Sequence, residues 1–63
     1  MLTPQDKGRV VRIRASRDGM FVDVTGVIVD VFGPAGQLYV EVKNPEGVHS
    51  RIWVQDIVEI SFS

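Results

Sequence analysis

The chain contains few side chains that could perform covalent chemistry. His49 is the only histidine among 63 residues, and cysteine is absent. A Ser/His/Asp or Cys/His arrangement within one chain would need His49 as its base, and no Gly-x-Ser-x-Gly elbow surrounds any serine. We therefore expect no enzyme activity and interpret His49 as a solvated surface group.

The sequence also lacks the ligand sets of common cofactors. Metal binding requires several convergent ligands, and His49 with Glu41 or Glu46 supplies too few of them. The segment 33–36 contains two glycines, but it has neither the lysine nor the following helix of a phosphate-binding loop. We expect no metal and no cofactor.

Aromatic and basic residues carry the remaining functional signal. Alternation places Tyr39 outward, and Trp53 has the opposite parity to Ile52. Exposed aromatic rings near arginine commonly anchor protein interfaces, and they can also stack on unpaired bases. The candidate binding residues are Phe21, Tyr39, Trp53, Arg12, Arg14 and Arg51. A structural alternative stays open, in which Trp53 covers one end of a barrel and Phe21 tucks under a loop.

Charge is distributed unevenly along the chain, whose formal net charge is −1. Residues 1–17 contain five basic side chains and one acidic one, whereas residues 18–63 contain two basic and seven acidic ones. Such asymmetry can mark an acidic partner or nucleic acid near the first strand. We favour the interpretation that the arginines alternate with core residues on a solvated strand face.

The N-terminal residues and the hydropathy bear on location. Residues 1–7 contain no apolar core of a signal peptide, and no run approaches the roughly 18 apolar residues of a membrane span. The absence of cysteine suits a reducing compartment. We expect a soluble, cytoplasmic domain without membrane contact.

Short runs rich in valine and isoleucine must position these residues. Seventeen of the 63 residues are Val or Ile, and Gly, Pro and Asn separate the runs. The expected strands cover residues 9–14, 27–32, 38–43, 48–54 and 57–60. A helical turn capped by Thr3 precedes them, and a long connection over 15–24 joins the first two. Gly26 is expected to relieve crowding where a strand bends.

Alternation within these runs predicts the core. The expected core residues are Val11, Ile13, Val31, Val40, Val42, Ile52, Val54, Val58 and Ile60. A bulge near Val29 and Asp30 would switch the parity of the second run and decide whether Ile28 joins them. Five short strands with a tight turn before the last predict an all-β fold, a small SH3-like barrel that forms one domain over residues 1–63.

Two segments resemble a known family. The segments 8–13 and 18–31 resemble the KOW domain, most of all that of the C-terminal domain of NusG-type transcription factors, with its Gly-x-x-Val-Arg-Val, Asp-Gly-x-Phe and Gly-Val-Val pattern. The resemblance implies a module of transcription or translation machinery that contacts protein or RNA through its loops. Phe21 matches the loop aromatic that such domains offer to partners.

The chain departs from this family further on. The loop 44–50 lacks the second aromatic residue beside an arginine, and Asp30 stands where ribosomal KOW proteins cluster basic residues. Another small barrel, plasmid-encoded type II dihydrofolate reductase, has Val-Gln-Ile-Tyr where this chain has the segment 50–53. Only Ile52 of that segment matches, so we do not expect reductase activity.

Together these observations predict a non-catalytic interaction module with a protein partner. The first alternative is a KOW-type RNA or DNA contact through Arg12, Arg14 and Arg51 with the aromatic residues. A second alternative is a homo-oligomer whose exposed edge and aromatic patch pair with themselves. Asp23, Glu41 and Glu59 are expected to offset the arginines, which favours the protein partner.

Overall fold

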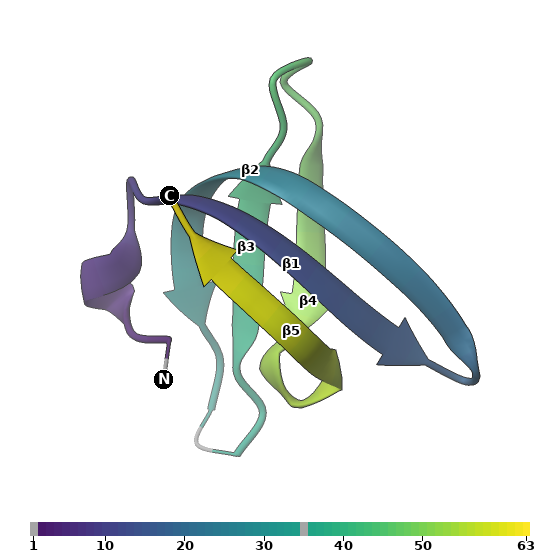
Figure 1. Ribbon diagram of the computed structural model, residues 1–63. Helices are drawn as coiled ribbons and strands as arrows, with labels where there is room; N and C mark the ends of the chain where they lie inside the picture. Colours follow the sequence, from purple (N-terminus) through teal and green to yellow (C-terminus); the bar gives the residue numbers. More distant parts are fainter. Residues whose placement is uncertain (1, 35) are drawn as a thin grey trace.

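Five antiparallel strands form one strongly bent sheet in the computed structural model, which describes residues 2–34 and 36–63 (Figure 1). The strands are β1 (Val10–Arg17), β2 (Met20–Phe32), β3 (Tyr39–Lys43), β4 (His49–Trp53) and β5 (Ile57–Phe62). Two 3-10 turns, η1 (Pro4–Asp6) and η2 (Val54–Asp56), complete the elements. The expected turn over 33–36 includes Ala35, and the expected N-terminal segment includes Met1. Both residues lie outside the described ranges.

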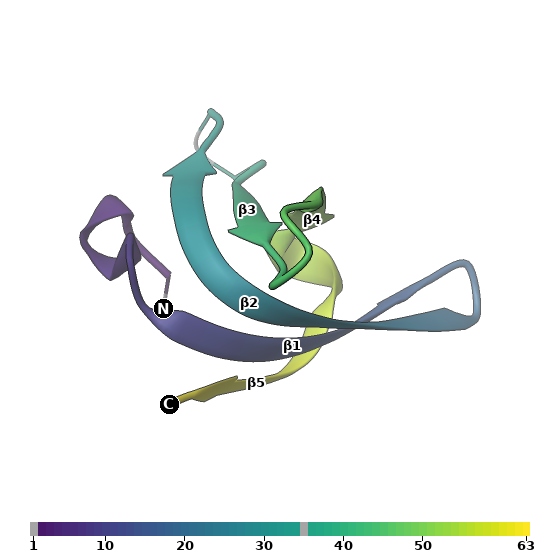
Figure 2. The same cartoon turned by 90° about the horizontal axis from the view of Figure 1, so that it is seen from above.

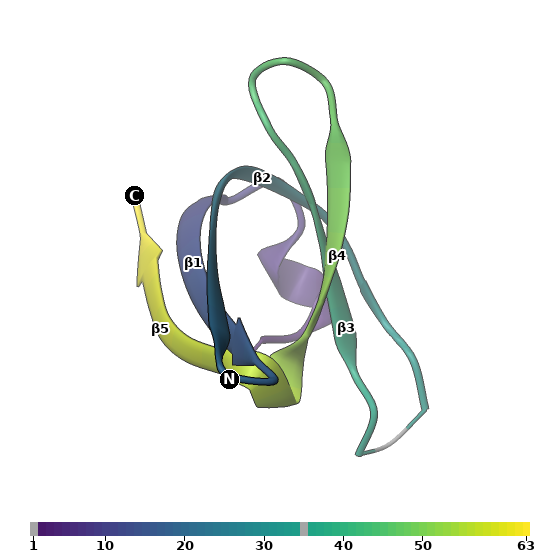
Figure 3. The same ribbon diagram turned by 90° about the vertical axis from the view of Figure 1, so that its right-hand side faces the viewer.

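The strand order β4-β3-β2-β1-β5 confirms the all-β, five-stranded prediction. β2 passes from the pair β1 and β5 on one side to the pair β3 and β4 on the other, so it belongs to both halves (Figures 2 and 3). No hydrogen-bonded ladder joins β4 to β5 among the residues described. The sheet therefore curls over its core without closing.

The N-terminal turn forms as the sequence predicts. The Thr3 side chain accepts a hydrogen bond from the backbone N–H of Gln5, and the Asp6 carboxylate accepts one from the backbone N–H of Thr3. Pro4 occupies the first helical position, where its missing N–H costs nothing. The turn is anchored to the sheet because Gly8 donates to the carbonyl of Ile28.

The long connection expected over residues 15–24 was wrong. β1 continues to Arg17 and β2 begins at Met20, in continuous register from Val10↔Val27 to Arg17↔Met20. Asp18 and Gly19 alone form the turn, with φ values of 52° and 80°. Asp-Gly at two successive positive φ angles is the preferred chemistry of a two-residue hairpin, so this stretch is a projecting hairpin.

Gly26 is the point at which β2 bends between the two halves of the sheet. It is buried, and an added Cβ would overlap the backbone carbonyl of Lys43 on β3. The expectation that glycine relieves crowding here is supported, since the close neighbour is backbone and cannot rotate away.

The core lies inside the bend. Its buried residues are Leu2, Val11, Ile13, Ala15, Ile28, Val31, Val40, Val42 and Ile52. The register between β2 and β3 shifts between Ile28 and Asp30, so the bulge that the sequence left open is present and lets both Ile28 and Val31 face inward. Leu2 and Ala15 were not expected in the core, because both lie outside the alternating runs.

Three expected core positions need correction. Val58 is 59% exposed because the register of β1 with β5 shifts, so that Arg14 opposes Glu59 and Ala15 opposes Ile57. Val58 is thereby the extra residue of a bulge, and Ile57 packs against the core in its place. Val54 belongs to η2 rather than to the fourth strand and, like Ile60, is only partly buried.

Candidate interaction surface

The structure divides the six predicted binding residues between two regions. Tyr39, Arg51 and Trp53 lie on β3 and β4, on the face opposite to the core residues Val40 and Ile52. The other three residues lie on the β1–β2 hairpin: Arg12, Arg14 and Phe21. The two groups therefore form separate surfaces.

An aromatic row crosses the first region. Phe32, Tyr39 and Trp53 occupy paired positions on β2, β3 and β4. The ring centroids of Phe32 and Tyr39 are 5.7 Å apart, and those of Tyr39 and Trp53 are 4.0 Å apart. The Phe32 and Tyr39 rings are stacked, the Tyr39 and Trp53 rings are tilted by 37°, and all three are half-buried, so the row stabilises three strands. Phe32 was not among the predicted binding residues, although it flanks the same turn as Tyr39.

Charged groups beside this row are also paired. The Glu41 carboxylate lies 2.8 Å from Nδ1 of His49, and it accepts a 3.2 Å hydrogen bond from Nε of Arg51. These two contacts, with His49 the larger cause, lower the pKa of Glu41 below its ordinary value of 4.5. The Arg51 guanidinium also lies 5.1 Å from the centre of the Phe32 ring.

The outer face of the hairpin carries the other arginines. Arg14 lies between Asp23 and Glu59 in the sheet register, and its guanidinium covers the Phe21 ring at 4.4 Å. Arg12 lies between Thr25 and Ser61. The predicted offset of arginines by Asp23, Glu41 and Glu59 is thus present at Arg14 in register and at Arg51 by direct contact.

The hairpin tip exposes three successive apolar residues. Met20 is 71% exposed, Phe21 58% and Val22 53%. Alternation puts Met20 and Val22 on the inner face and Phe21 on the outer one, so both faces of the tip are apolar. A run of this kind on a surface commonly marks an interaction site.

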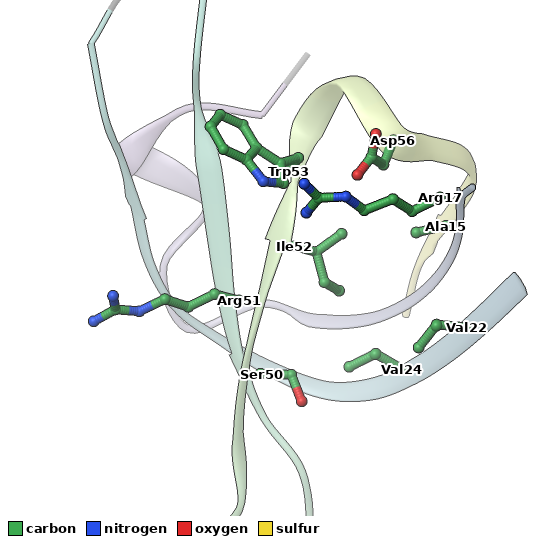
Figure 4. Close-up of a pocket in the computed structure, with 9 residues that line it drawn as sticks. All are labelled: Ala15, Arg17, Val22, Val24, Ser50, Arg51, Ile52, Trp53 and Asp56. Carbon is green, nitrogen blue, oxygen red and sulfur yellow. The ribbon is translucent and has the colours of Figure 1, made fainter. Parts of the chain in front are cut away.

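An open hollow of about 380 Å³ lies between the hairpin and β4 (Figure 4). Ala15, Val22 and Val24 line it from the hairpin, opposite Ile52. Trp53, Arg17 and Asp56 gather at the end next to η2. We call Met20, Phe21 and Val22 together with this hollow the hairpin surface. Residues 15–24 were expected to form a connection rather than strands, so the sequence did not place Val22 and Val24 opposite β4.

A second apolar hollow, of about 540 Å³, lies over Val10, Val27 and Val29, with Lys43 and Pro45 at its rim. Its floor is paired backbone, because Val27 opposes both Val10 and Lys43. Its lining is mostly apolar, so it offers mainly apolar contact.

The described residues hold no cluster of three or more His, Asp or Glu side chains that could bind a metal ion. None of the helical turns in the described ranges is long and apolar enough to cross a membrane.

Comparison of the chain with family models, with curated proteins and with solved structures finds no match.

Proposed function

We propose that the protein is a non-catalytic interaction module that binds a protein partner through the hairpin surface. The observation that carries the proposal is the exposed apolar run Met20–Phe21–Val22 beside an apolar hollow. Burial of such area would be favourable at about 25 cal/mol per Å². That the partner belongs to transcription or translation machinery rests on the KOW resemblance alone.

The charge arrangement favours protein over nucleic acid. Nucleic acid affinity comes largely from phosphate neutralisation by free cations. Arg51 is engaged by Glu41, and Arg14 has acidic neighbours on both sides in the sheet. Arg12 is the one predicted cation whose register neighbours, Thr25 and Ser61, are uncharged.

The proposal is tested by affinity capture from the native host with quantitative mass spectrometry. Val22→Asp places a charge on the hairpin surface, and Val58→Asp places the same charge at a similarly exposed valine on β5. We expect a specific partner on the wild type and on Val58→Asp, and its loss on Val22→Asp. The proposal is contradicted if the partner is lost equally from Val22→Asp and Val58→Asp. It is also contradicted if the wild type captures no specific partner.

A titration of single-stranded RNA near physiological salt tests the alternative. We expect no tight binding at this salt concentration, because among the three predicted arginines only Arg12 has no acidic neighbour. Micromolar or tighter binding that falls in Arg12→Ala or Arg14→Ala would favour the nucleic acid function instead.

A further inference from the structure

The first half of β2 has a free backbone edge. β2 pairs with β1 from Met20 onward, but its pairing with β3 begins at Val27. Ile28 donates its N–H to Arg9, so the even-numbered residues of β2 bond toward β1. The N–H and C=O groups of Phe21, Asp23 and Thr25 therefore point to the other side. No backbone partner for them is found in the described chain.

This edge lacks the usual protection against further strand pairing. Lysine, proline and bulges commonly block such edges. The segment 21–25 reads Phe-Val-Asp-Val-Thr, with neither lysine nor proline, and its register with β1 is regular. The outer edge of β4, by contrast, carries His49 and Arg51, both held by Glu41.

A groove runs beside this free edge. The hollow between hairpin and β4 shares Val24 and Ser50 with a neighbouring hollow of about 340 Å³. This 340 Å³ hollow extends toward the β3–β4 turn and is lined there by Asp23, Glu46 and Pro45. The groove is thus apolar over Ala15, Val22 and Val24 and acidic at the end near the β3–β4 turn, where no basic residue lines it.

We propose that an extended segment of the partner adds to the edge of β2 as a new strand. Its backbone pairs with Phe21, Asp23 and Thr25, and its alternate apolar side chains enter the hollow over Val24. A lysine or arginine at one end lies beside Glu46, which matches the charge of that end. The inference rests on the proposed function and names its ligand class, an unfolded or extended segment of protein.

A second copy of the chain fits this groove less well. If β2 of another copy paired with this edge, its residues Val22 and Val24 would still face their own hollow. The groove of each copy would stay unfilled, whereas a free strand fills it with its own side chains. The occupant is therefore a segment that is not already part of a sheet.

The first probe is a library of random dodecapeptides displayed on phage and selected on the full chain. We expect enriched peptides with apolar residues at alternate positions, a lysine or arginine at one end and no central proline. In amide hydrogen exchange, a synthetic version of the best peptide should protect the N–H groups of Phe21, Asp23 and Thr25. Enrichment of proline-rich peptides, or no enrichment, contradicts the proposal.

Backbone pairing is tested by two substitutions at one position. Asp23→Ala and Asp23→Pro both remove the carboxylate, but only the proline removes the outward N–H, and neither affects the ladder to β1. We expect the proline variant to bind the peptide about tenfold more weakly than the alanine variant, since one backbone hydrogen bond is lost. Equal affinities would overturn strand addition.

If Asp23→Pro does not fold, N-methylated peptides replace it. Methylation of the peptide amides that face β2 should abolish binding, while methylation of the alternate amides should leave it intact. Loss of binding with both sets, or with neither, contradicts strand addition.

The charge at the groove end has its own matched pair. Glu46→Lys should weaken binding of the lysine-bearing peptide at low salt, and Glu59→Lys, on β5, should not. An equal effect of both variants would show a general charge effect and overturn the assigned orientation.

The outcomes also separate this inference from the proposed function. If the cellular partner is lost with Val22→Asp but kept equally by Asp23→Pro and Asp23→Ala, the interaction module stands and strand addition is wrong. Protection of Phe21, Asp23 and Thr25 without peptide, together with a dimer in light scattering, would assign the edge to a second copy.

Discussion

The β3–β4 face and the β1–β2 hairpin both carry aromatic residues beside arginine, but these side chains contact one another on the first and are largely exposed on the second. On the β3–β4 face, the aromatic rings stack and Arg51 and His49 share Glu41. On the hairpin, Met20 and Val22 lie open, and Phe21 is covered only by an arginine. An aromatic residue beside an arginine can thus complete a sheet in one place and remain available for a partner in another.

The difference follows from strand length. β2 has 13 residues and β3 has five, so β3 can cover only the second half of β2. Where three strands lie side by side, each outward side chain finds neighbours across the strands. From Met20 to Thr25, β2 pairs with β1 but not with β3. The backbone edge of β2 that faces away from β1 is therefore unpaired there, and the side chains at the hairpin tip are exposed.

The largest effect is expected at Gly26, where the two regions meet. Gly26→Ala places a Cβ against the carbonyl of Lys43 and should destabilise the fold by more than about 3 kcal/mol, or prevent folding. Gly47→Ala is the control, because its Cβ would meet open space and costs only the strain of a positive φ, about 1 kcal/mol. Urea denaturation measures both. Similar losses for the two variants would show that β2 and β3 do not approach closely at Gly26.

The next effect contrasts a buried with an exposed valine. Val40→Ala removes methyl groups from a fully buried site on β3 and should cost about 1–3 kcal/mol. Val22→Ala, at the hairpin tip, should change stability by less than about 0.5 kcal/mol. A neutral Val40→Ala in urea denaturation would mean that β3 faces the other way.

The aromatic residues should separate stability from binding. Trp53→Ala removes the ring that packs on Tyr39 and should lower the free energy of unfolding by about 1–3 kcal/mol. Phe21→Ala loses only a cation–π contact and should cost less than about 1 kcal/mol, yet weaken partner capture. Thermal unfolding and affinity capture of both variants measure this split. If Phe21→Ala destabilises as much as Trp53→Ala, the hairpin tip is part of the core.

The period-two patterns were sufficient to predict the all-β class and most of the core. Val11, Ile13, Val40 and Val42 alternate without interruption, and each is buried as expected. The bulge near Val29 stayed open from the sequence, because alternation alone did not decide whether Ile28 is buried together with Val31. In these segments local pattern and tertiary contact agree.

The errors occurred where tertiary contacts override the local pattern. Asp18-Gly19 is a strong hairpin signal, but four polar residues in the segment 14–19 suggested a loop. The bulge that exposes Val58 depends on how β5 pairs with β1. This register cannot be predicted from the sequence of β5 alone. The hollow depends on how far β2 extends beyond β3, so alternation alone could not bring Val24 opposite Ile52.

The smallest effect is expected from acid, on the β3–β4 face. Glu41 has a lowered pKa in the folded protein, so its contribution to stability is present above its ordinary value of 4.5 and is lost as pH falls through the lowered value. Asp6, whose pKa is lowered by the Thr3 backbone and Arg9, acts in the same direction in every variant. The difference in melting temperature between wild type and Glu41→Gln should therefore shrink from pH 7 toward strongly acidic pH. In an NMR titration of the Glu41 carboxyl group, His49→Ala should raise its pKa more than Arg51→Ala. A pKa that neither substitution moves would show that Glu41 is free in solution, and the contrast between an occupied face and an open hairpin would then fail.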